Sequence, residues 1–120
     1  NIALTGDPAD RERVGRALAR AAADGVAARL PAGLDTRLGA TGHGVSGGEA
    51  RRLAIARAAY ARREVILADE PTADLDPETA GAVTEGLLAL AAEGATLIVA
   101  THDMALAGRL DARIVLGDAP

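Results

Sequence analysis

Two short apolar runs on either side of a helical segment are the feature that most constrains the fold. Val65 to Ala68 and Ala95 to Ala100 each have the length and composition of a buried strand. Between them, an amphipathic segment begins at Asp76-Pro77 and ends at Gly94. A strand, a helix and a second strand in this order favour two neighbouring parallel strands joined by a right-handed crossover. The sequence therefore predicts an α/β fold with a parallel sheet.

The first half of the chain is predicted to be helical. Asp7-Pro8 has the form of a helix start, and it precedes an apolar stripe at helical spacing, formed by Val14, Ala17, Leu18 and Ala21. Asp24 is expected to cap a second short helix, which Pro31 ends. Residues 31–45 are rich in glycine and have no clear period, which predicts a loop.

Ser46-Gly47-Gly48-Glu49 has the spacing of a capping box, and it opens a helix predicted to run to about Ala61. A capping box explains the serine and the glutamate but not the two glycines, since glycine inside a helix costs about 1 kcal/mol relative to alanine. One reason for glycine here is to let backbone N–H groups approach a phosphate at the positive end of the helix. Arg51 and Arg52 are interpreted as a solvated helix face.

Two adjacent carboxylates, Asp69 and Glu70, follow the first apolar run. They could be a solvated strand end, but the carboxyl ends of parallel strands are where α/β sheets bind ligands. Neighbouring strand residues point to opposite faces, which predicts different tasks for the two carboxylates. His102 follows the second run, where a lone histidine is usually structural, and Asp103 can cap a short helix.

Four motifs in this order resemble the second half of an ATP-binding cassette (ABC) nucleotide-binding domain. They are Ser46-Gly47-Gly48-Glu49 with its helix, Val65 to Pro71, Ala73-Asp74-Leu75-Asp76, and Thr101-His102-Asp103. In that family these motifs are the signature loop, the Walker B motif, the D-loop and the switch histidine. The resemblance covers most of the chain and implies ATP and Mg²⁺ as ligands.

The resemblance also implies a role for each residue. The signature loop Ser46 to Glu49 would cap the γ-phosphate of ATP bound to the opposite subunit, and Asp76 would lie where the D-loop crosses between subunits while also capping a helix. Asp69 would hold Mg²⁺, mostly through water. Glu70 would orient and deprotonate the attacking water, and His102 would contact the γ-phosphate.

The residues that hold a nucleotide in this family are missing from the sequence. It contains no lysine, so it has no G-x-x-x-x-G-K-[ST] phosphate loop, and no glutamine for a Q-loop. Tyr60 is its single aromatic residue, and its position in the signature helix makes it a poor platform for adenine. We therefore expect a partial P-loop NTPase that does not hydrolyse ATP by itself. Residues 1–62 would form the ABC helical subdomain and 63–120 the C-terminal part of the RecA-like core, without the Walker A half.

Ile114 to Leu116 is predicted to be a third strand. In the family, the strand that leads into the phosphate loop lies between it and the strand at Ala95 to Ala100. We expect this slot to be vacant, filled by another chain or closed by rearrangement. Uncovered strand edges and apolar faces recruit other chains, so the isolated chain is expected to self-associate or to be marginally stable.

Charge and apolar content limit the partners. A net charge of -4 argues against a nucleic-acid surface or an anionic membrane surface, and no apolar run approaches the length of a membrane span. We expect three partners: a transmembrane domain and the Walker A half of the same parent chain, and a second ABC subunit, identical or not. The parent protein would then lie at the cytoplasmic face of a bacterial inner membrane.

Some stretches of the chain resemble the sequences of ABC exporters. Leu30 to Thr36 is typical of exporters that fuse membrane and ATPase domains in one chain, and the signature and Walker B stretches most resemble cysteine/glutathione exporter subunits of the CydC/CydD type, CydD being preferred. One alternative is a soluble ABC ATPase of DNA maintenance, of the SMC or Rad50 kind, but the heptad arms and basic surface of that class are not seen. Another is a truncated, non-catalytic interaction module, against which Glu70 and His102 argue.

Overall fold

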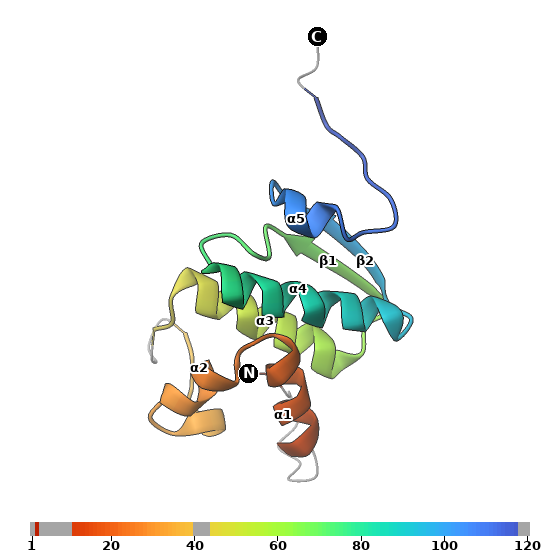
Figure 1. Ribbon diagram of the computed structural model, residues 1–120. Coiled ribbons are helices and arrows are strands. Elements are labelled where there is room, and N and C mark those ends of the chain that lie inside the picture. Colours follow the sequence, from red (N-terminus) through yellow and green to blue (C-terminus); the bar gives the residue numbers. More distant parts are fainter. Residues whose placement is uncertain (1, 3–10, 40–43, 118–120) are drawn as a thin grey trace.

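The computed structural model describes residues 2, 11–39 and 44–117, and the predicted helix start at Asp7-Pro8 lies outside them. The described elements form a helical layer against a small sheet, and the extended C-terminal segment leaves this body (Figure 1). In chain order they are α1 (Arg11–Arg20), α2 (Asp24–Arg29), η2 (Gly33–Asp35, a 3₁₀ turn), α3 (Gly47–Ala61), β1 (Val65–Asp69), α4 (Pro77–Ala92), β2 (Thr96–Ala100) and α5 (Met104–Ala107).

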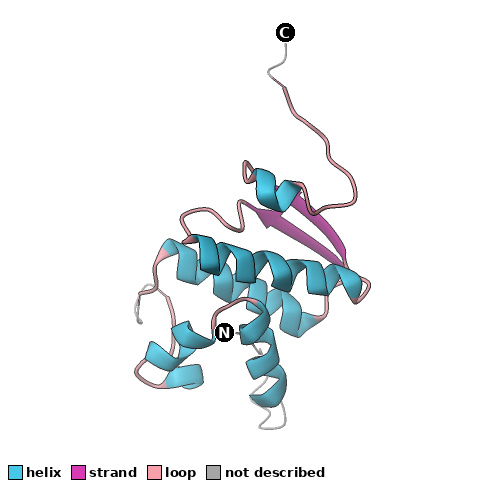
Figure 2. Ribbon diagram, viewed as in Figure 1, coloured by secondary structure: helices cyan, strands magenta, loops and turns pink. Residues whose placement is uncertain are grey.

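The sheet confirms the predicted strand pairing. β1 and β2 are parallel, with Val65 opposite Thr96 and Asp69 opposite Ala100, and α4 connects them (Figure 2). Because the strands are parallel and in register, both end at the same edge of the sheet. The residues that follow β1 and β2 therefore meet there.

Side-chain caps begin the helices that position these motifs. Ser46 and Glu49 form the predicted capping box at the start of α3, and Asp76 caps α4, which has a proline in its first turn. α4 is followed by Gly94, whose φ of +106° is a backbone conformation that suits glycine. The predicted capping role of Asp24 is wrong: Ala23 is the N-cap of α2 without a side-chain cap, and Asp24 is the first helical residue.

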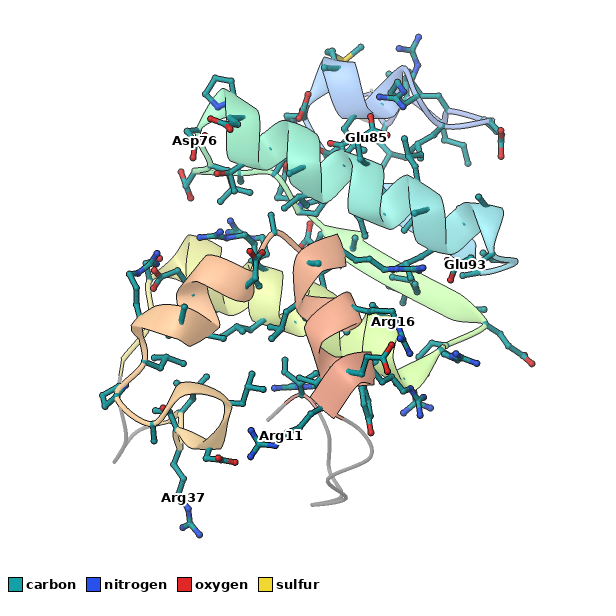
Figure 3. All side chains as sticks on the ribbon, turned by 60° about the horizontal axis from the view of Figure 1, so that its bottom comes forward. Arg11, Arg16, Arg37, Asp76, Glu85 and Glu93 are labelled. Carbon is teal, nitrogen blue, oxygen red and sulfur yellow. The ribbon has the colours of Figure 1, made fainter. Side chains whose placement is uncertain are left out.

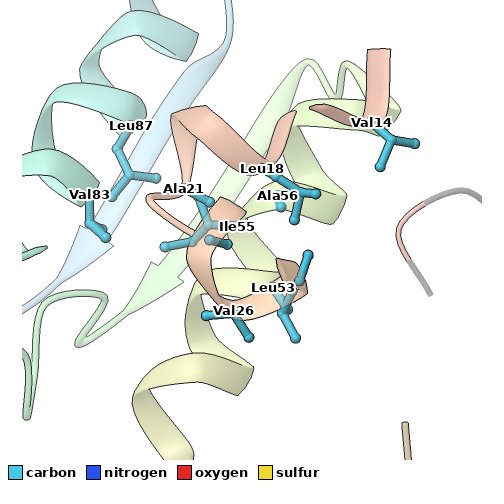
Figure 4. Close-up of a cluster of buried hydrophobic side chains, with 11 residues drawn as sticks. Val14, Leu18, Ala21, Val26, Leu53, Ile55, Ala56, Val83 and Leu87 are labelled. Atoms are coloured by element: carbon cyan, nitrogen blue, oxygen red, sulfur yellow. The ribbon is translucent and has the colours of Figure 1, made fainter. Parts of the chain in front are cut away.

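The core lies between the helices. Its buried members come from α1, α2, α3, α4 and the turn after α1, and most of them are labelled in Figure 4: Val14, Leu18, Ala21, Ala23, Val26, Ala27, Leu53, Ile55, Ala56, Val83 and Leu87. The apolar stripe predicted for α1 is confirmed, because all four of its residues are buried. From the sheet, Leu97 packs against this cluster, which identifies the sheet face that α4 covers.

α1 and α4 approach each other closely at Gly86. A Cβ atom on this residue would lie 1.6 Å from the backbone oxygen of Arg20, so only glycine fits without a shift of the backbone. Arg20 also donates a hydrogen bond of 2.7 Å from Nη1 to Oε2 of Glu93 at the end of α4. The C-terminal end of α1 is thus fixed against α4 by a backbone contact and by an ion pair.

The other face of the sheet is uncovered. The side chains of Val65, Leu67 and Ile98 are 55%, 76% and 55% exposed, whereas Ile66 on the covered face is 7% exposed. The expectation that both strands are buried is therefore wrong for one face. In the described part of the chain, no element packs there to cover the alternate residues of β1 and β2.

Two further expectations are corrected by the structure. Ile114 to Leu116 does not form a strand: it is extended, unpaired and at least 76% exposed, because the described residues offer it no neighbouring strand. The loop predicted for residues 31–45 contains a short 3₁₀ turn, η2, in its described part.

Candidate functional site

The candidate site is the edge of the sheet where β1 and β2 end. The backbone N–H of Glu70 donates to the carbonyl of Ala100 over 2.8 Å and so extends the parallel ladder by one residue. The Glu70 carboxylate then accepts two hydrogen bonds from the segment after β2. The hydroxyl of Thr101 donates to Oε2 over 3.1 Å, and the backbone N–H of His102 donates to Oε1 over 3.0 Å.

The structure brings the predicted pair Glu70 and His102 together. Nε2 of His102 lies 3.7 Å from Oε1 of Glu70, and the imidazole is fully exposed while the Glu70 side chain is 33% exposed. The imidazole is therefore accessible from solvent while it lies beside the Glu70 carboxylate. A carboxylate and an imidazole are groups that can transfer protons at ordinary pH.

Glu70 has a φ of +44°, which is unusual for a residue with a side chain. Such conformations persist where the surroundings fix them, and they cluster at functional sites. Here the ladder bond and the two carboxylate bonds fix the residue. The simple alternation predicted for Asp69 and Glu70 ends at this turn, because Glu70 is no longer in strand conformation.

Asp69 is the last residue of β1 and is exposed. It lines an open groove of about 190 Å³ between α3 and β1, together with Arg51 and the apolar residues Ala54, Ile55, Ala58, Ile66, Leu67, Ala68, Pro71 and Leu87. No group of three or more His, Cys, Asp or Glu side chains among the described residues could hold a metal ion by itself. A single exposed carboxylate fits Mg²⁺, which usually keeps several waters and takes its other ligands from phosphate.

A contact that sequence reasoning missed joins the two loops at this edge. The hydroxyl of Thr72 donates to Oδ2 of Asp103 over 2.8 Å, while Oδ1 of Asp103 caps α5 through the N–H groups of Ala105 and Leu106. The Thr72 hydroxyl and then the Leu106 N–H lower the pKa of Asp103. Residues 72 and 103 are far apart in the chain, and no local sequence pattern predicts their contact.

The signature-type residues lie at the start of α3. Oγ of Ser46 accepts from the N–H of Glu49 over 3.2 Å, and Oε2 of Glu49 accepts from the N–H of Ser46 over 3.0 Å. The backbone bond from Ser46, followed by an ion pair with Arg29, lowers the pKa of Glu49. The Glu49 carboxylate therefore has structural partners within this chain.

The two signature glycines differ in their surroundings. A Cβ atom on Gly47 would meet nothing within 4 Å, whereas one on Gly48 would lie 2.9 Å from Cδ2 of Leu75. A Cβ atom at position 48 would displace the end of the Leu75 side chain, so Gly48 leaves room for that side chain. Of these two glycines, only Gly47 has open space beside it among the described residues, so the single explanation predicted for both glycines does not apply to Gly48.

Asp76 is an N-cap, as predicted, and its side chain begins α4 in Figure 3. Its Oδ1 accepts from the N–H of Thr79 over 2.9 Å, and its Oδ2 from the Thr79 hydroxyl over 2.6 Å. The hydroxyl and then the N–H of Thr79 lower the pKa of Asp76. In the described residues, no hydrogen bond or ion pair joins Asp76 or the signature residues to Glu70 or His102.

The interpretation of Arg51 and Arg52 as a solvated face is wrong. Both are partly buried, and each donates a hydrogen bond to a backbone carbonyl: Arg51 to Ala73 over 2.5 Å and Arg52 to Ala22 over 2.6 Å. Arg51 thus connects α3 to the turn after Glu70.

Tyr60 lies in the contact between α1 and α3. The central carbon of the Arg13 guanidinium lies 4.4 Å from the centre of the Tyr60 ring.

Comparison with known proteins gives a consistent result. The model of one family, the ABC transporter family, matches residues 6–73. An ATP-dependent lipid A-core flippase from Polaromonas sp. is 42% identical over 119 residues, which are 99% of this chain and 20% of that protein. The L-cystine import ATP-binding protein TcyN of Bacillus subtilis is 45% identical over 86 residues, 72% of this chain and 33% of the relative.

A lipoprotein-releasing system ATP-binding protein LolD from Nitrobacter winogradskyi is 46% identical over 85 residues, 70% of this chain and 37% of the relative. The chain therefore spans between 20% and 37% of the length of these three proteins. Within the described residues, no helix combines the length and apolar character needed to cross a bilayer.

Proposed function

Because this chain belongs to the ABC transporter family, we propose that it supplies the signature helix and the hydrolytic edge of an ATPase domain that powers transport. The observation that carries the proposal is the convergence of Glu70 and His102, 3.7 Å apart, at the shared end of two parallel strands. This edge is where α/β sheets bind ligands. A carboxylate and an exposed imidazole at such an edge suit proton removal from water and stabilisation of developing charge.

The proposed chemistry follows from the contacts of Glu70. Each carboxylate oxygen already accepts one hydrogen bond, from Thr101 or from the His102 N–H, and each keeps a further lone pair. In hydrolysis, Glu70 would take a proton from water while the water oxygen bonds to the terminal phosphorus and the bridging P–O bond breaks. The exposed imidazole of His102 would then donate to a phosphate oxygen.

Asp69 would hold Mg²⁺, mostly through water, and the ion when bound neutralises charge on the phosphate oxygens. Asp69 is suited to this because it is exposed and precedes Glu70 at the same strand end. The start of α3 would cap the terminal phosphate of ATP on a second subunit. Gly47 supports that role, since nothing lies within 4 Å of the position of its missing Cβ atom.

We propose an exporter as the parent protein, with cysteine or glutathione as cargo. The sequence of Leu30 to Thr36 supports an exporter, and the sequences of the signature and Walker B motifs support the CydC/CydD type. The transmembrane domain, a Walker A half and a second ATP-binding subunit would be its partners, at the cytoplasmic face of a bacterial inner membrane. ATP-driven uptake of radiolabelled cysteine or glutathione into inverted vesicles tests the cargo, with lipid A as the competing candidate.

The hydrolytic role is tested in the complete ATPase that carries this segment. Glu70→Gln keeps the shape of the side chain and removes the base, so turnover should fall at least about a hundredfold while ATP binding is retained. Glu64→Gln is the matched control, because it makes the same change just before the other end of β1, at an exposed side chain. Turnover of Glu70→Gln close to that of the control would contradict the proposal.

A further inference from the structure

The two loops that follow β1 and β2 are joined by a continuous series of hydrogen bonds. The Thr101 hydroxyl donates to Oε2 of Glu70 over 3.1 Å and accepts from the N–H of Asp103 over 3.0 Å. Asp103 in turn accepts from the hydroxyl of Thr72, which lies two residues after Glu70. The series therefore leaves the Glu70 loop, passes through Thr101 and Asp103, and returns to the same loop.

The position of Thr101 in this series fixes the direction of its hydroxyl. A hydroxyl has one proton, and the Asp103 N–H donates to the Thr101 oxygen, so the Thr101 proton is left for Glu70. Rotation of the side chain would break both bonds. Since Thr101 is only partly exposed, water can replace these partners only in part.

Glu70 needs such a fixed donor. Its backbone is in the left-handed region, at a φ of +44°, and within the described part of the chain its side chain is held only by the Thr101 hydroxyl and by the segment at His102. The His102 imidazole is fully exposed and cannot lock the carboxylate by packing. The hydroxyl of Thr101 is thus the one partly buried side-chain donor to Glu70 among the described residues.

We infer that Thr101 is a positioning residue, which orients the Glu70 carboxylate for proton removal from water. The inference rests on the proposed function, because it assigns Thr101 to the reaction of Glu70. Thr101 would not touch the substrate and would act through the Glu70 carboxylate. The bond from Thr72 to Asp103 keeps the Asp103 backbone N–H in place and so supports the same orientation.

The test uses the complete ATPase with Thr101→Val, which keeps the branched shape and removes the hydroxyl, and Thr101→Ser, which keeps the hydroxyl. Thr101→Val should lower kcat about tenfold. This is less than the roughly hundredfold loss in rate that full misplacement of a catalytic group can cause. The KM for ATP should change less than about twofold, because Thr101 does not contact ATP. Thr101→Ser should retain kcat within about threefold, since the donor is restored.

A double variant separates positioning from a general structural role. In a Glu70→Gln background, Thr101→Val should cause no further loss of residual turnover, because the carboxylate that it orients is gone. The same tenfold loss in that background, or a normal kcat for Thr101→Val beside an inactive Glu70→Gln, would overturn the inference and leave the proposed function intact. An active Glu70→Gln would instead overturn the proposed function. If Thr101→Val does not fold, Thr101→Ala takes its place, and a kcat equal to that of Thr101→Ser would overturn the inference.

Discussion

The helical cluster and the sheet edge are organised by different forces. The cluster around Leu87 and Val83 is closely packed and excludes water, with both of these side chains fully buried. At the sheet edge, Glu70 is held by hydrogen bonds in a strained conformation, and His102 is exposed. The comparison indicates that packing of the helices stabilises the chain, whereas the residues proposed for chemistry are positioned at some cost in stability.

The largest expected effect on stability is a difference between alanine substitutions of a buried and an exposed leucine. Leu87→Ala removes a fully buried side chain and should lower the free energy of unfolding by about 3 kcal/mol. Leu67→Ala makes the same change on the uncovered sheet face, where the side chain is 76% exposed, and should change it by less than about 0.5 kcal/mol. Urea denaturation followed by circular dichroism measures both. Equal losses would mean that the face of Leu67 is covered in solution.

A smaller effect is expected from two glycines of α4. Gly86→Ala places a Cβ atom 1.6 Å from the Arg20 backbone oxygen, and the necessary shift should cost about 2 kcal/mol. Gly81→Ala meets nothing within 4 Å and should stabilise the chain by up to about 1 kcal/mol, because alanine favours helix. Thermal melts of the two variants compare them directly. Stabilisation by Gly86→Ala would show that α1 does not approach α4 in solution.

Local patterns predicted much of the fold, because their physical causes are local. The capping box of Ser46 and Glu49, the cap at Asp76 and the strand–helix–strand order of β1, α4 and β2 all depend on residues near one another in sequence. The family resemblance directed attention to Glu70 and His102. Their side-chain proximity follows from the parallel register of the two strands.

What the sequence could not predict depends on distant neighbours. Ile114 to Leu116 has strand composition, but a strand needs a partner, and strand propensity mostly reflects fit to adjacent strands. The approach of Gly48 to Leu75 and the bond from Thr72 to Asp103 arise only when separate loops meet. Arg51 and Arg52 look like surface residues until the carbonyls that accept from them are in place.

We propose that Glu70 serves the chemistry of the sheet edge and does not stabilise the fold. Glu70→Gly tests it, because glycine adopts a φ of +44° without strain but loses the carboxylate and its two hydrogen bonds. The relief of strain and the lost bonds are each worth roughly 1–3 kcal/mol and oppose each other. Measured by urea denaturation beside Leu87→Ala, Glu70→Gly should have a free energy of unfolding within about 1 kcal/mol of the unsubstituted chain. A decrease as large as that of Leu87→Ala would contradict this proposal, because Glu70 would then contribute to the stability of the fold.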